Sequence, residues 1–215
     1  MTEQEWLNSN NPHAMLVWMK QEGRAVSLRT LRLFAAGCAR NVNPPRGSSL
    51  IAQGLSVAER YADRQATARE LANASLQMPK GCIQGRALWG NRELWAGVED
   101  ILWYRSSMGL MDAFLLRDLV GNPFRPWLSE PATVNELDAR PGAQIFLYRW
   151  SHANDHLAWC LADVCYEKND WRSLPVIADA LEDNGCEAAD VLTHLRSPGP
   201  HARGCWALDL VLGKW

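Results

Sequence analysis

Four side chains that can bind a metal ion recur at helical spacing in the C-terminal half of the chain. His152, His156 and Cys160 are four residues apart, and Asp163 follows three residues later. Residues three or four apart share one helix face, and two imidazoles with a carboxylate suit zinc or iron. We therefore predict His152, His156 and Asp163 as metal ligands of a small metal-binding protein or metal-dependent hydrolase.

A plainer interpretation of this His/His/Asp stripe is favoured. Ala153 stands where an HExxH metalloprotease motif has its glutamate, so the general base of that motif is missing. The apolar face of the predicted helix is formed by other residues, Leu157 and Leu161 among them. The histidines lie toward the polar edge of that face, where they would meet water or a neighbouring helix.

The last thirty residues hold two further candidate constellations. His201, Cys205 and Asp209 repeat at four-residue spacing and suggest an activated thiol. On a helix, however, Asp209 lies beyond Cys205 and cannot orient the imidazole as a catalytic triad requires. The favoured interpretation is a buried apolar cysteine, and we predict no catalytic residue.

The second constellation is Cys186, His194, His201 and Cys205, a C-x7-H-x6-H-x3-C pattern of zinc ligand types. The apolar side of the predicted helix 188–196 carries Leu192 and Leu195, and on a helical wheel His194 points away from it. This pattern therefore ranks behind the 152–163 stripe. The chain has no GxGxxG, P-loop or GxSxG motif.

Helical periodicity dominates the whole chain and predicts an all-α fold. Capping residues open several helices, with Thr2–Glu5 and Thr67–Glu70 as capping boxes and Ser27 as an N-cap. Segment 130–147 is ambiguous, with helix preferred over a short strand at 144–148. We predict a single domain, 1–215, built as an irregular bundle or a short solenoid-like array of antiparallel helical hairpins. The C-terminal helices are expected at 151–167, 174–184, 188–196 and 201–212.

The charge distribution and the cysteine spacing indicate in which compartment the protein works and which partners it has. Its 215 residues carry a net charge of −2, with an excess of basic side chains in the N-terminal half. Arg29, Arg32 and Arg40 lie off the apolar stripe of their helix, and we interpret them as a solvated surface rather than a nucleic-acid interface. The six cysteines include no CxxC pair, and the chain shows neither a signal-peptide pattern nor a membrane span. We expect a cytoplasmic location and no membrane partner.

Several blocks of the chain resemble an uncharacterised all-helical bacterial protein family that is abundant in planctomycete-type genomes. The blocks are residues 30–40 (TLRLFAAGCAR), 57–63 (VAERYAD), 115–126 (LLRDLVGNPFRP) and 174–186 (LPVIADALEDNGC), with GPHARGCW at 199–206 and a stretch running to Gly213. Residues 79–112 and 129–172 depart from the family pattern. The resemblance implies a helical bacterial protein and brings no known reaction, cofactor or catalytic residue.

The predicted function is a non-enzymatic interaction or scaffold module that binds a protein partner and needs no cofactor. Its support is dense core patterning, eleven tryptophans and the absence of a specific catalytic signature. Tryptophan is a frequent interface anchor, and Trp6, Trp127 and Trp215 are the residues predicted to be exposed for this purpose. The alternative is the metal protein with zinc or iron at the 152–163 stripe. No small-molecule substrate is predicted.

Overall fold

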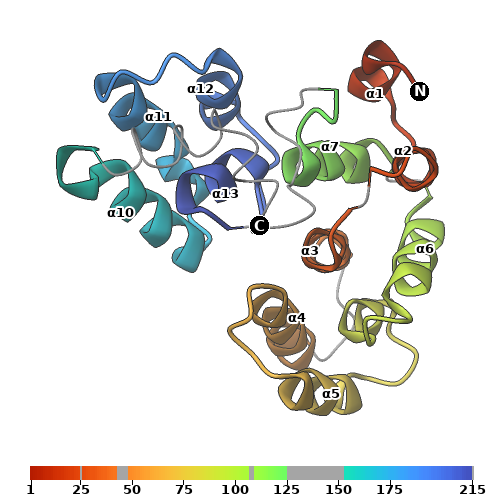
Figure 1. The fold of residues 1–215 in the computed structure, drawn as a ribbon. Coiled ribbons are helices and arrows are strands. Elements are labelled where there is room, and N and C mark those ends of the chain that lie inside the picture. Colours follow the sequence, from red (N-terminus) through yellow and green to blue (C-terminus); the bar gives the residue numbers. More distant parts are fainter. Residues whose placement is uncertain (25, 43–47, 107–108, 125–152, 215) are drawn as a thin grey trace. The chain divides into compact units, whose positions relative to one another are not determined.

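The computed structural model describes residues 1–24, 26–42, 48–106, 109–124 and 153–214 (Figure 1). These residues form helices and contain no strand, which confirms the all-α prediction. By their internal contacts they divide into two compact units, Met1–Leu119 and Val120–Trp215. The single domain and the bundle or solenoid arrangement stay predictions, and segment 130–147 lies outside the described residues.

The N-terminal unit contains the helices that the capping signals predict. The Thr2 and Thr67 capping boxes form, and Ser27 accepts a hydrogen bond from the Thr30 backbone N–H. The helices are α1 (Glu3–Asn8), α2 (Pro12–Gln21), α3 (Leu28–Arg40), α4 (Ser48–Ala62), α5 (Ala68–Gln77), the 3-10 helix η1 (Ile83–Leu88), α6 (Leu94–Tyr104) and α7 (Gly109–Val120).

Ion pairs fasten these helices to one another. Arg40 makes two hydrogen bonds, of 2.6 and 2.8 Å, to the carboxylate of Glu59 and so ties α3 to α4. Arg105, which follows α6, makes three to Asp112 of α7, and both side chains are buried. A paired guanidinium and carboxylate can be buried because each satisfies the charge of the other.

The prediction of a solvated arginine surface on α3 is wrong for Arg32. Only 1% of this residue is exposed, and its guanidinium donates to the carbonyls of Ala87 and Trp89 and to the side chain of Asn91. Burial lowers the pKa of Arg32. Arg32 therefore pins the end of η1 against α3, and neither it nor Arg40 offers a free charge to a nucleic acid.

The prediction that Trp6 is an exposed interface anchor is also wrong. Trp6 is fully buried, with its ring centroid 6.0 Å from that of Trp18, so it is not an exposed anchor. It is the buried residue of the short helix α1, which needs an apolar side chain to hold it in place. Trp127 and Trp215 lie outside the described residues.

The C-terminal unit is built from α10 (Ala153–Lys168), the 3-10 helix η3 (Trp171–Ser173), α11 (Leu174–Asp183), α12 (Ala189–Arg196) and α13 (Trp206–Leu212). Their apolar faces meet in one core that includes Tyr166, Ile177, Leu195 and Leu208. Gly185 ends the α11 region with a left-handed φ of 84°. The predicted helix at 201–212 begins only at Trp206, so residues 197–205 form an irregular connection between α12 and α13.

No helix in the described part of the chain combines the length and the apolar character that a membrane span needs.

Candidate metal centre

The predicted 152–163 stripe is only partly visible. His152 lies outside the described residues. His156 and Cys160 are exposed on α10 and Asp163 is half-buried. His156 has a left-handed φ of 63°, which departs from the regular helix that the four-residue spacing assumes. The His152, His156 and Asp163 site therefore stays a prediction.

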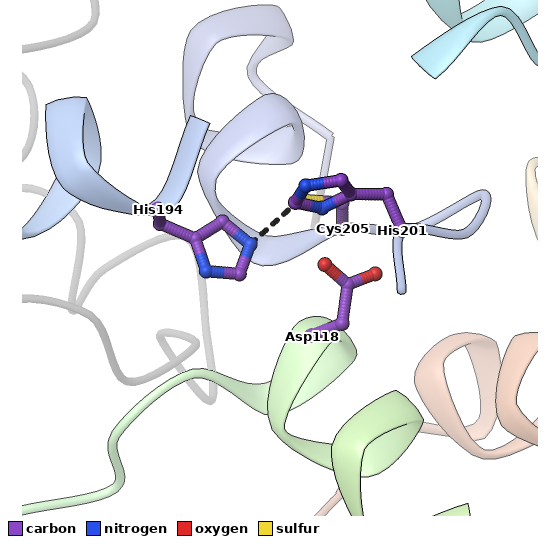
Figure 2. Close-up of side chains that lie close together, drawn as sticks. All are labelled: Asp118, His194, His201 and Cys205. Carbon is purple, nitrogen blue, oxygen red and sulfur yellow. Dashed lines mark hydrogen bonds between the residues drawn. The ribbon is translucent and has the colours of Figure 1, made fainter. Parts of the chain in front are cut away.

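A different set of ligand-type side chains comes together within the C-terminal unit. His194, His201 and Cys205 each place one donor atom so that these atoms lie within 4.8 Å of one another. Nε2 of His194 is 3.2 Å from Sγ of Cys205, and Nδ1 of His201 is 4.0 Å from the same sulfur. Figure 2 shows the two rings turned toward the thiol; Asp118, also drawn there, belongs to the other unit and is not counted in this cluster.

Local structure places each of the three side chains. His194 lies in the last turn of α12, and Cys205 is the residue that precedes α13. The connection between them turns at Gly199, whose φ is 89°. A Cβ at Gly199 would lie 2.8 Å from the backbone nitrogen of His201, so glycine is required there. The turn brings His201 back over the end of α12.

Ser197 fixes the orientation of the His201 ring. Nε2 of His201 is 3.0 Å from the carbonyl oxygen of Ser197, which can only accept, so Nε2 carries the proton. In the neutral ring the lone pair is then on Nδ1, the nitrogen nearer to Cys205. The Ser197 hydroxyl also donates to the carbonyl of His194 at 2.7 Å. A backbone carbonyl on the far ring nitrogen is the usual outer support of a metal-binding histidine.

The two nitrogen–sulfur separations are close to those around a tetrahedral zinc ion, of which these side chains would fill three of the four positions. With Zn–S near 2.3 Å and Zn–N near 2.0–2.1 Å, a sulfur and a nitrogen on one zinc are about 3.6 Å apart. The two measured nitrogen–sulfur distances, 3.2 and 4.0 Å, lie on either side of that value. Small side-chain shifts would therefore seat an ion between the three donors.

Other buried thiols of the same unit are held differently. Burial raises the pKa of Cys165 to about 11, and its Sγ donates to the carbonyl of Asp170. Burial also raises the pKa of Cys186. Among the described residues neither thiol is grouped with other metal-ligand side chains, whereas Cys205 has two imidazoles next to it.

Sequence reasoning found part of this cluster and misjudged its geometry. The C-x7-H-x6-H-x3-C pattern contains all three residues, but Cys186 is not one of the grouped ligands. The expectation that His194 faces away is wrong, because the chain folds back over the half-buried ring. His201 and Cys205 do not share a helix, so the four-residue spacing that linked them to Asp209 has no helical meaning here.

No family model, curated protein or solved structure matches the chain. The resemblance to a planctomycete-type family stays a prediction.

Proposed function

We propose that this protein binds one divalent metal ion of the zinc class through His194, His201 and Cys205. The observation that carries the proposal is the convergence of two ring nitrogens and one sulfur within 4.8 Å. The carbonyl of Ser197 adds weight, because it leaves the His201 lone pair on the nitrogen that faces Cys205. This site replaces the 152–163 stripe as the first location to test for metal.

The donor set favours zinc over iron. A thiolate with imidazoles is typical of zinc and copper sites, whereas non-haem iron takes two histidines and a carboxylate. Cys205 is fully buried, so a thiolate at this position would need a positive partner. A zinc ion would supply that charge and bind the soft sulfur and both nitrogens.

Metal analysis of protein purified without an affinity tag tests the proposal. We expect close to one equivalent of bound zinc, and Co²⁺ should produce the absorption bands of thiolate-bound cobalt. Cys205→Ser should abolish these bands while circular dichroism shows that helix content is kept. The matched control is the pair His156→Ala and Cys160→Ser, which removes the same residue types from exposed positions on α10.

The variants separate the two predicted metal locations. Binding that survives in the α10 variants and is lost in Cys205→Ser supports the proposed site. Loss in His156→Ala with retention in Cys205→Ser would assign the metal to the 152–163 stripe instead. Cobalt bands that are absent from the wild-type protein at saturating metal would rule out the proposed function.

We propose protein binding as a second function, since apolar side chains are exposed at the end of α6 and along α7. Trp103 is 81% and Tyr104 58% exposed at the end of α6. Exposed positions on α7 add Leu110, Met111 and Phe114. The buried Arg105–Asp112 pair joins the residue after α6 to the first turn of α7. Exposed aromatic and methionine side chains are typical of interfaces.

The first partner to test is a second copy of the chain, because a two-fold contact places the same residues on both sides. Sedimentation equilibrium should show reversible dimers whose dissociation constant rises at least about tenfold in Trp103→Ser, the loss of a large interface anchor. Leu76→Ser is the control, since Leu76 is 85% exposed on α5. A protein that stays monomeric at all concentrations excludes self-association through this surface.

A further inference from the structure

We infer that the ion at His194, His201 and Cys205 is a structural one that orders the C-terminal end of the chain. The inference rests on the proposed metal binding and adds its role. With metal bound, the connection 197–205 is held against α12 and α13. Without metal, this part of the unit opens more often, while the N-terminal unit is unaffected.

The positions of the ligands support this role. His194 and Cys205 are eleven residues apart; His194 precedes the irregular connection, Cys205 is its last residue and His201 lies between them. One ion bound to all three closes this segment at two points. Closing a loop removes conformational freedom from the open state and so favours the ordered one.

The two helices on either side need such support. α12 has eight residues and α13 has seven, lengths at which a helix is marginal by itself. Neither begins with a side-chain cap: Ala188 cannot supply one, and Cys205 makes no capping hydrogen bond. In the N-terminal unit, by contrast, the six-residue helix α1 has a complete capping box. A side-chain cap contributes about 1 kcal/mol, which α12 and α13 do without.

The cluster also reaches into the core, because Cys205 is buried while His194 and His201 are half-buried. Cys205 belongs to the buried core of the unit together with Leu195 and Leu208, residues of α12 and α13. The His194 ring lies against that of Trp206, with centroids 4.9 Å apart. An ion bound here therefore contacts side chains on which the packing of both helices depends. A surface ion would leave that packing unchanged.

In the metal-free protein a proton takes the place of the ion. The 3.2 Å contact between Cys205 Sγ and His194 Nε2 is a hydrogen bond, so one proton lies between them. Metal binding forms the metal–sulfur and metal–nitrogen bonds and releases this proton to solvent. A proton joins only two of the three ligands, whereas the ion joins all three. The metal-free cluster therefore holds the connection 197–205 less strongly than the metal-bound cluster does.

Hydrogen exchange of the whole chain, read by mass spectrometry, tests the role. Metal-free protein is compared with protein holding zinc at a free concentration about a hundredfold above the dissociation constant. If opening of the segment releases the ion, exchange in peptides covering residues 186–214 should slow by about a hundredfold. Peptides covering α3 and α4 should not change. Cys205→Ser should lose the zinc effect and Cys160→Ser should keep it.

The outcomes separate this inference from the proposed function. Cobalt bands without any change of exchange in 186–214 would overturn the structural role and leave metal binding intact. Equal protection in both units would also overturn it, since the effect would not be local. A wild-type protein with no cobalt bands would remove both proposals. The decisive comparison uses the wild-type chain with and without metal, so it does not depend on a variant that folds.

Discussion

The two units solve the same problem, a polar group inside an apolar core, with different chemistry. In the N-terminal unit two buried arginines are satisfied within the fold: Arg105 by the carboxylate of Asp112, and Arg32 by backbone carbonyls. In the C-terminal unit the corresponding cluster, His194, His201 and Cys205, consists of groups that gain and lose protons. The buried arginines hold neighbouring segments together. The proton-binding groups, in contrast, can exchange a proton for a metal ion.

The largest expected effect comes from removing one partner of the buried Arg105–Asp112 ion pair. Arg105→Ala leaves the buried carboxylate of Asp112 without its guanidinium, and we expect a loss of about 3–5 kcal/mol in the free energy of unfolding. Urea denaturation measures it, and the loss should be the same with and without zinc. The control is Arg196→Ala, an arginine paired with Asp179 on the surface, where less than about 1 kcal/mol is expected. Similar losses in the two variants would contradict the comparison.

A second prediction concerns a thiol that should not take part in metal binding. The pKa of Cys165 is about 11, above its ordinary value of 9.0, because the fold favours the neutral thiol. Its contribution to stability is therefore complete below about pH 9 and is lost as pH rises toward 11. Over that window the free energy of unfolding should fall by about 2 kcal/mol.

The test is a series of urea titrations from pH 8 to 11. Cys165→Ala should reduce the alkaline loss relative to wild type, although its stability at pH 8 is lower. Zinc affinity should be unchanged in this variant. An alkaline profile identical to that of the wild-type protein would show that the thiol of Cys165 is not the titrating group.

Helix boundaries were predictable where the signal is local. The Thr2 and Thr67 capping boxes depend on residues three positions apart, and both form as the sequence predicts. The role of Arg32 was not predictable, because its carbonyl partners lie 55 and 57 residues further along the chain. A helical wheel treats any arginine as solvated, and nothing local to α3 indicates that η1 will cover this one.

The candidate site shows the same limit. The residue types were recognised, since His194, His201 and Cys205 appear in the predicted zinc pattern. Their geometry was not, because it depends on the turn at Gly199 and on a helix that begins at Trp206 instead of 201. Spacing arguments assume one regular helix, and here the ligands lie at a helix end, in a turn and before the next helix.

A third prediction uses protons to sharpen the contrast between the units. Metal binding at the cluster must displace at least the proton shared by His194 and Cys205. The dissociation constant for zinc should therefore fall about tenfold for each unit of pH rise for each proton released. Calorimetric titrations from pH 6 to 8, in buffers of different ionisation enthalpy, measure both the affinity and the protons released. An affinity that does not vary with pH would contradict binding through this thiol.

The smallest expected effect concerns the side-chain capping box at the start of α5, which lies in the N-terminal unit. The Thr67 hydroxyl accepts from the backbone N–H of Glu70, and the Glu70 carboxylate accepts from the backbone N–H of Thr67. Thr67→Ala removes the first of these bonds and should cost about 1 kcal/mol in the free energy of unfolding. Thr67→Ser keeps a hydroxyl and should lose much less. Both values should be independent of zinc, because α5 obtains from its own side chains the end support that α12 and α13 lack. A zinc-dependent effect of Thr67→Ala would show that the units do not differ in this way.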